Sequence, residues 1–221
     1  MILAAGRGKR MRPLTDTIPK PLLTIAGKPL IVWHIERLAA AGIHDLVVNH
    51  AHLGQQIEDT LGNGATWGVH IRYSPEGEGH ALNTGGGILH ALPMLGERPF
   101  LVISADVWCD VELGHLSLSP GTLVNLVMVD NPGHHPEGDF CLAGDRLHAQ
   151  GQPRLTYSGI GAYAPALFAQ CEPGAFPVAP LLRNAMRTGK AAGEYHQGQW
   201  SDVGTPERLA ELDRQISSRR P

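Results

Sequence analysis

Runs of apolar residues alternate with helix-like segments through the first half of the chain. The strand-like runs are residues 1–5 (MILAA), 45–51, 69–76 and 99–106. The helix-like segments between them are residues 29–42, 53–64 and 84–95. The run at 99–106 begins with a continuous apolar stretch, as in a strand that is covered on both faces. The alternation predicts an α/β fold, a three-layer sandwich in which helices lie on both faces of a mostly parallel, mixed sheet.

The second half of the chain has a looser pattern. Strand-like segments at residues 122–130, 155–164 and 193–204 accompany a short hairpin at 139–149 and an amphipathic helix at 178–190. A last helix is expected over residues 205–220, with Thr205 as its N-cap and Pro206 in its first turn. Because no linker or repeat interrupts the chain, we expect one domain over residues 1–221 with a small β-rich insertion for a ligand.

Composition excludes several classes of partner. The chain has 221 residues, a formal net charge of −3 and three widely spaced cysteines. The acidic balance argues against nucleic acid, and the cysteine spacing argues against a zinc knuckle or a disulfide framework. No apolar run is long enough to span a bilayer and no signal peptide is present, so we expect no membrane partner and a cytoplasmic location. Nothing in the sequence indicates an oligomeric state.

A basic, glycine-containing loop directly follows the first apolar run. Its glycines are Gly6 and Gly8, and its cations are Arg7, Lys9 and Arg10. A dinucleotide fingerprint is excluded because Met11 stands where a third glycine is required, and a P-loop is excluded because no glycine-lysine pair precedes serine or threonine. Two interpretations remain. The loop binds a nucleoside triphosphate together with Lys20, which two prolines hold, or it is a basic surface loop without a ligand.

The motif Leu-Ala-Ala-Gly-x-Gly-x-Arg-Met at residues 3–11, followed by Pro-Lys-Pro-Leu at 19–22, resembles the signature of the sugar-1-phosphate nucleotidyltransferases. The segments YSPEGE, TGGGI, DVW, VDNPGHHPEGDF and WSDVGT resemble most the compact bacterial N-acetylmuramate-1-phosphate uridylyltransferases. The resemblance implies the Rossmann-like nucleotide-diphospho-sugar transferase fold, with residues 1–120 mainly for the nucleotide and 121–221 mainly for the sugar phosphate. Members usually have a few residues before the first strand, so either this strand is short or the chain starts upstream of Met1.

The resemblance also implies which residues bind the nucleotide. They are Leu3, Ala4, Ala5, Gly6, Gly8, Lys9, Arg10, Lys20, Gly85 and Gly86. Arg10 and Lys20 are implied to be catalytic. The glycines at 85–87 let a nucleobase lie close to the backbone, and a glycine-rich helix start without a ligand is the alternative. Residues 79–84 lack a glutamate that the closest relatives often have, so uracil, thymine and guanine all stay open as the base.

Two aspartates are the candidate metal ligands. Asp106 ends the strand-like run at 99–106, and Asp202 ends the segment QWSD. Ligands of open α/β sheets bind at the carboxyl ends of strands, but residue spacing alone does not bring these distant aspartates together. The resemblance implies that they bind one Mg²⁺ jointly. A turn aspartate is the alternative for Asp106, and for Asp110 a metal-site role and a surface role are equally open.

For the sugar phosphate, the resemblance points to Asp139, Ser158 and Gly159, together with Ser104 just before the metal aspartate. Ser158 and Gly159 could instead be an ordinary polar strand residue beside a close-packed glycine. Residues 131–135 are expected at the pocket rim, where His134 and His135 either line the pocket or are solvated. Two tryptophans near the metal aspartates, Trp108 and Trp200, are expected to pack beneath the site, and a position facing a ligand is the alternative for either.

The implied reaction is UTP plus a sugar 1-phosphate giving a UDP-sugar and pyrophosphate, with N-acetylmuramic acid alpha-1-phosphate as the sugar and peptidoglycan recycling as the setting. A phosphate monoester is already an anion at neutral pH, so no catalytic base is needed. Lys20 would neutralise the reacting phosphates, and Arg10 the leaving pyrophosphate. The alternatives are mannose 1-phosphate with GTP, glucose 1-phosphate with dTTP or UTP, and, outside this class, a non-catalytic nucleotide-sensing protein.

Overall fold

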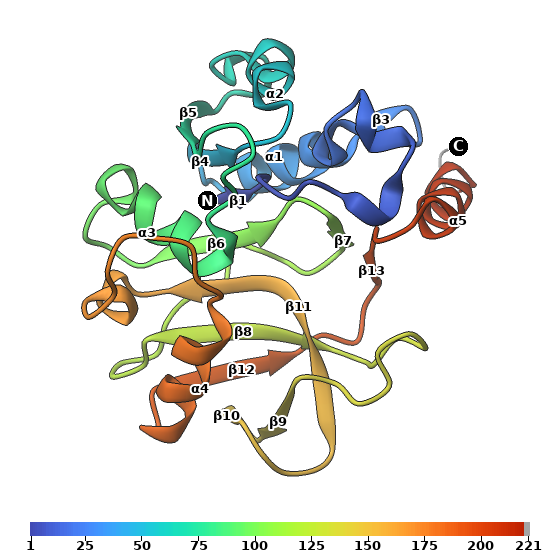
Figure 1. The fold of residues 1–221 in the computed structure, drawn as a ribbon. Coiled ribbons are helices and arrows are strands. Elements are labelled where there is room, and N and C mark those ends of the chain that lie inside the picture. Colours follow the sequence, from blue (N-terminus) through green and yellow to red (C-terminus); the bar gives the residue numbers. More distant parts are fainter. Residues whose placement is uncertain (219–221) are drawn as a thin grey trace.

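A nine-stranded sheet runs through the computed structural model, which describes residues 1–218. In spatial order its strands are β5 (His70–Pro75), β4 (Asp45–His50), β1 (Ile2–Leu3), β6 (Phe100–Ser104), β11 (Arg154–Tyr163), β8 (Val124–Val129), β12 (Ala191–Tyr195), β10 (Arg146–His148) and β9 (Phe140–Ala143). Strands from the two halves of the chain therefore share one sheet (Figure 1).

The sheet is mixed, as the sequence predicts. Strands β5, β4, β1 and β6 pair in parallel with one another in that order, and β8 pairs in parallel with β12. Strand β11 pairs antiparallel with both β6 and β8, and β10 pairs antiparallel with β12 and β9. Strands β9 and β10 form the expected hairpin, and β9 also pairs antiparallel with the start of β11.

Helices cover both faces of the sheet (Figure 1). Their bounds are α1 (Leu30–Ala40), α2 (Gly54–Leu61), α3 (Asn83–Leu95), α4 (Ala179–Arg187) and α5 (Pro206–Ser217). In strand β4, Leu46 and Val48 join the buried cluster of α1 and α2, whereas Val47 joins the cluster of α3 and α4. Because successive strand residues point to opposite faces, this alternation demonstrates the three-layer sandwich.

The prediction of one strand at residues 193–204 is wrong. Strand β12 ends at Tyr195, and the chain then leaves the large sheet to form β13 (Trp200–Asp202). Strand β13 pairs antiparallel with β7 (Val107–Cys109) in a separate two-stranded ribbon. The break falls in the polar segment 196–199, where the amide of Gln199 donates to the Asp110 carboxylate at 2.7 Å instead of continuing the sheet.

Helix α5 closes the described chain beside the N-terminal loop. Its buried Leu212 and Ile216 pack with Met11 and with the ribbon of β2 (Thr24–Ile25) and β3 (Lys28–Pro29). Thr205 is its N-cap, as predicted, and accepts a hydrogen bond from the amide of Arg208 at 3.4 Å. The expected residues 219 and 220 of this helix lie outside the described residues. Within residues 1–218, no helix is both long and apolar enough to cross a membrane.

Candidate active site

Two adjoining cavities open where strands β1 and β6 end. The first cavity, of about 470 Å³, is lined by the N-terminal loop, Lys20 and Asp106. The second cavity, of about 480 Å³, is lined by β11, the loop containing His134 and the end of β13. Leu3, Thr84 and Ser104 line both cavities, so the two share a wall. A ligand with two chemically different parts can therefore span them.

The N-terminal loop is held over Lys20 by its second glycine. Gly8 has a φ of 63°, and a Cβ there would lie 3.0 Å from Thr15 and 3.3 Å from the Cβ of Lys20. The Thr15 hydroxyl donates to the Gly8 carbonyl at 2.9 Å. Only glycine fits this backbone conformation and this close approach at low cost. The loop residues that reach the first cavity are Leu3, Ala4, Ala5, Gly6, Arg7 and Lys9.

Lys20 forms an ion pair with Asp106 at the floor of the first cavity. The Nζ atom lies 2.6 Å from the Asp106 carboxylate. The lysine side chain is 8% exposed, whereas that of Asp106 is 46% exposed. The side chain of Lys20 is thus buried, whereas the carboxylate of Asp106 is exposed enough to bind a second partner. The 3-10 turn at Lys20–Leu22, which follows Pro19, fixes the start of that stem.

The ribbon of β7 and β13 brings the two candidate metal aspartates together. Asp202 stands opposite Val107 in the ladder, and Val107 directly follows Asp106 in the chain. The amide of Val203 donates to the Asp106 carbonyl at 2.8 Å. Asp106 lines the first cavity and Asp202 the second, so the pair straddles the junction. Asp202 is engaged by Arg208 at 2.6 Å and by His134 at 3.1 Å.

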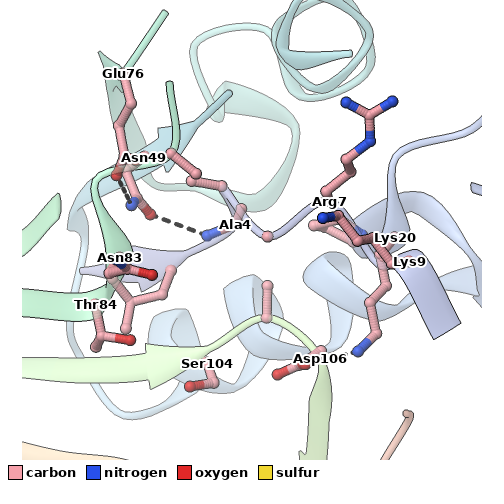
Figure 2. Close-up of a pocket in the computed structure, with 16 residues that line it drawn as sticks. Ala4, Arg7, Lys9, Lys20, Asn49, Glu76, Asn83, Thr84, Ser104 and Asp106 are labelled. Atoms are coloured by element: carbon pink, nitrogen blue, oxygen red, sulfur yellow. Dashed lines mark hydrogen bonds and ion pairs between the residues drawn. The ribbon is translucent and has the colours of Figure 1, made fainter. Parts of the chain in front are cut away.

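A buried polar chain that the sequence analysis missed closes the other end of the first cavity (Figure 2). The amide of Ala4 donates to Asn49 at 2.9 Å, and Asn49 donates to Glu76 at 2.6 Å. The other oxygen of Glu76 accepts from the amide of Leu82 at 2.6 Å. Asn49 lies near the end of β4, and Glu76 directly follows β5. The rule that polar residues at carboxyl ends of parallel strands meet at one edge could have found both.

The helix-start glycines Gly85 and Gly86 directly follow Thr84, which lines both cavities, but neither glycine is among the lining residues. The amides of Gly85 and Gly86 donate to the carbonyl of Phe176 at 3.0 and 3.1 Å. A Cβ on Gly85 would lie 2.4 Å from the Phe176 ring, and one on Gly86 would lie 2.1 Å from the Gly174 carbonyl. Their lack of a side chain serves close packing of α3 against residues 174–176. The neighbouring Ala81, Asn83 and Thr84 line the first cavity instead.

The expected sugar-phosphate residues all line the second cavity. Asp139 accepts from the amide of Tyr157 at 2.8 Å, and its other oxygen lies 3.2 Å from His135. Ser158 is fully buried, and its carbonyl accepts from the indole of Trp200 at 2.9 Å. Gly159 has a φ of 84°, and a Cβ there would lie 2.9 Å from the Ser104 hydroxyl. A bulge in β11 between Tyr157 and Gly161 accompanies this approach.

Other candidates are divided between the cavities and the surroundings. Arg10 lines the second cavity rather than the first. Trp200 lines the second cavity, whereas Trp108 packs against the cluster beneath α5. Asp110 accepts from the Gln199 amide at 2.7 Å and lies 2.7 Å from His196, at the far end of the ribbon. Asp110 is not among the residues that line either cavity.

Two ionisable groups near the site, the buried His34 and the half-buried Tyr157, are neutral at physiological pH. Burial, followed by the charge of Arg37, lowers the pKa of His34 to about 4. Its Nε2 lies 2.8 Å from the Val107 carbonyl, so the neutral ring donates a hydrogen bond that supports β7. Burial also raises the pKa of Tyr157 well above its ordinary value, and its hydroxyl lies 2.9 Å from that of Tyr163. The wall of the second cavity beside Asp139 is therefore an uncharged phenol.

Comparison with known proteins gives consistent relatives. An N-acetylmuramate alpha-1-phosphate uridylyltransferase of Neisseria meningitidis serogroup B is 51% identical over 220 residues, covering 96% of this chain and 95% of the relative. The protein of that name from Caulobacter vibrioides is 34% identical over 222 residues, covering 94% and 92%. A crystal structure from Bacillus anthracis, described as a glucose-1-phosphate thymidylyltransferase, has a TM-score of 0.83 at 18% identity and covers 100% of this chain and 95% of its own.

That structural likeness shows the fold, and the sequence matches show the family. The family described as nucleotidyl transferase matches residues 1–117, which hold β1, the basic loop, Lys20 and Asp106. The part of the chain that supplies Asp202 and the second cavity lies outside this match but within the two full-length relatives. The chain belongs to the nucleotidyl transferase family and is an enzyme of that kind.

Proposed function

We propose that the enzyme transfers a uridylyl group from UTP to N-acetylmuramic acid alpha-1-phosphate, releasing pyrophosphate and a UDP-sugar. The observation that carries the proposal is the Lys20–Asp106 pair in the first cavity, beside a second cavity that shares a wall with it and is lined by Asp202. The uridine triphosphate occupies the first cavity and the sugar phosphate the second. The names of the two full-length relatives support this choice of base and sugar.

The residues of the first cavity have distinct parts in this reaction. The basic loop and its amides bind the phosphates of UTP, with Arg7 and Lys9 facing the cavity. Lys20 lines the first cavity beside Asp106, and we assign it to the α-phosphate that the sugar phosphate attacks. Its ammonium neutralises charge that builds up on these oxygens during transfer. The polar chain through Asn49 and Glu76 fixes the backbone of Ala4 and Leu82 against the base.

The second cavity binds and orients the nucleophile. The sugar 1-phosphate is an anion at neutral pH, because the second pKa of a phosphate monoester is about 6. It attacks without a protein base, so the task of this cavity is alignment. Asp139 and the backbone around Gly159 hold the sugar hydroxyls or amide, beside the neutral Tyr157. Arg10 lines this cavity and therefore contacts the sugar phosphate in our proposal, rather than the leaving pyrophosphate.

Asp106 and Asp202 fit Mg²⁺ as the cofactor. Carboxylate oxygens are the ligands this ion prefers, and the ladder of β7 and β13 holds the two residues at adjacent positions. Held by these two aspartates, the ion would neutralise negative charge on the phosphate groups of the substrates. We place the nucleotide-binding part mainly in residues 1–120 and the sugar-phosphate part mainly in residues 121–221. The enzyme would act in the cytoplasm, in peptidoglycan recycling.

A panel of nucleotides and sugar phosphates tests the proposal. UTP, dTTP and GTP are each combined with the 1-phosphates of N-acetylmuramic acid, N-acetylglucosamine, glucose and mannose, and pyrophosphate release is followed. We expect the highest kcat/KM for UTP with N-acetylmuramic acid alpha-1-phosphate. A higher value for another pair would transfer the assignment to that pair. No pyrophosphate with any pair would favour a nucleotide-sensing protein.

A further inference from the structure

Arg208, on the first turn of α5, is the closest partner of Asp202. Its Nη1 atom lies 2.6 Å from both carboxylate oxygens. The two side chains are 23% and 24% exposed, so water screens the pair only in part. His134 lies 2.6 Å from the same guanidinium atom and 3.1 Å from Asp202. Both oxygens of a candidate metal ligand are therefore already bound by a cation of the chain itself.

The position of Arg208 in its helix is electrostatically unfavourable. The residue stands three positions after the N-cap Thr205, at the positive end of the helix dipole. Acidic residues are favoured there, and basic residues are favoured in the last turn, where Arg214 lies. A cation at this end needs an anionic partner to offset the dipole, and Asp202 provides it.

The turn before the helix is shaped to let this arginine reach Asp202. A Cβ on Gly204 would lie 2.2 Å from Nη2 of Arg208 and 3.2 Å from the Asp202 carboxylate. The guanidinium therefore occupies the space that a side chain at position 204 would need. A longer side chain at 204 would force the guanidinium away from the carboxylate, because it cannot share the space.

Helix α5 does not depend on this ion pair for its attachment. Leu212 and Ile216 are buried in the cluster that contains Met11. The amide of Ala26 donates to the Asp213 carboxylate at 2.7 Å, which ties the middle of the helix to the β2–β3 ribbon. Loss of the contact between Arg208 and Asp202 should leave the helix in place. The pair is therefore free to open.

We propose that Arg208 is a displaceable counter-cation for Asp202, which the divalent cation must replace at the carboxylate. The guanidinium contacts both oxygens of Asp202, so an ion that binds this carboxylate would compete with it. Asp106 has an equivalent partner in Lys20 at the same distance, 2.6 Å. Each carboxylate is thus neutralised before the cofactor arrives. Arg208 is a positioning residue that lowers the affinity of the site for metal alone.

The proposal rests on the proposed function only through the assignment of Asp202 as a metal ligand. Titration of the nucleotide-free protein with Mn²⁺, followed by the electron paramagnetic resonance of the free ion, measures the affinity directly. We expect Arg208→Gln to bind Mn²⁺ about tenfold more tightly than wild type, since a hydrogen bond to a charged group no longer competes. Gly204→Ala keeps the charge but displaces the guanidinium, so its affinity should rise as well.

Arg214→Gln is the matched control. It removes the same charge from the same helix, where Arg214 is exposed and pairs with Glu211, and it should bind Mn²⁺ like wild type. A structural role for Arg208 predicts unchanged or weaker binding in Arg208→Gln, and either result would overturn the proposal. Equal tightening in Arg214→Gln would also overturn it, since general charge would then explain the effect. Melting temperatures without metal show that the variants are folded.

An Asp202→Asn variant separates this proposal from the proposed function. If it binds Mn²⁺ like wild type, Asp202 is not a ligand, and both the metal assignment and the counter-cation fail. If it loses Mn²⁺ while Arg208→Gln gains nothing, only the counter-cation fails. Pyrophosphate release from UTP is measured separately and does not enter this decision.

Discussion

The two cavities are built in different ways. The first is formed by the end of β1, the loop that follows it, Lys20 and the end of β6, so most of its charged groups belong to a short motif. The second draws on β11, the loop with His134 and β13, which are far apart in the chain and meet only through the fold. Local motifs therefore identify the first cavity, whereas long-range strand pairing creates the second.

The aspartates that join the cavities give the largest expected effect. Either Asp106→Asn or Asp202→Asn should lower kcat by roughly 10²–10³-fold, because each removes part of the charge stabilisation in the transition state. Pyrophosphate release at saturating Mg²⁺ measures this. Asp110→Asn on the same ribbon, bonded to His196, is the control and should keep its activity. If Asp106→Asn alone were impaired, the two cavities would not share one reaction centre.

Variants of Lys20 and Lys9 distinguish a role in the chemical step from a role in UTP binding within the first cavity. Lys20→Ala should lose roughly 10²-fold in kcat with a smaller change in the KM for UTP, because its charge acts mainly in the transition state. Lys9→Ala in the same cavity should mainly raise that KM. Steady-state kinetics with varied UTP distinguish the two patterns. A pure KM effect in Lys20→Ala would reduce this lysine to a binding residue.

A pair of variants tests whether each cavity holds its own substrate. Asn49→Ala leaves the buried Ala4 amide and Glu76 without their partner, at about 1–3 kcal/mol of stability, and should raise the KM for UTP. Asp139→Asn changes only the second cavity and should raise the KM for the sugar phosphate. Kinetics with each substrate varied in turn check this. If both variants affected the same substrate, the division between the cavities would be wrong.

The smallest expected effect is on the pH dependence of stability, through His34, whose ring bonds the Val107 carbonyl in β7. The pKa of His34 falls from 6.5 to about 4 on burial, so between these values the unfolded chain binds a proton that the folded chain does not. Stability therefore falls as the pH falls through this window. Between pH 7 and 5, wild type should lose about 2 kcal/mol more than His34→Gln in urea unfolding. Equal losses would mean that His34 is not held neutral.

The contrast between a cavity built from a local motif and one built by long-range strand pairing explains what the sequence could predict. Gly8 and Lys20 stand in one motif, and the alternation of strands and helices predicts the sheet that positions them. Asp202 could be placed beside Asp106 only through resemblance, since the break at 196–199 sends β13 out of the large sheet to β7. The alternation of polar and apolar residues does not show that the chain leaves the sheet at 196–199, because polar residues are also common in strands at the edge of a sheet.

Packing and burial account for what the sequence could not predict elsewhere. Gly85 and Gly86 have a packing role that no motif indicated, because their missing side chains accommodate Phe176 and Gly174 from a distant segment of the chain. Asn49 and Glu76 were overlooked because single polar residues beside apolar strands carry no recognisable spacing. Their pairing depends on the parallel register of β4 and β5, where Asn49 stands opposite Ser74.

A crystal structure with UDP-N-acetylmuramic acid and Mg²⁺ tests the central claim most directly. Our account places the uridine in the first cavity near Asn49 and the sugar in the second beside Asp139. The ion should contact both Asp106 and Asp202, and Arg208 should have left the carboxylate. A uridine bound in the second cavity, or an ion bound to neither aspartate, would contradict the account.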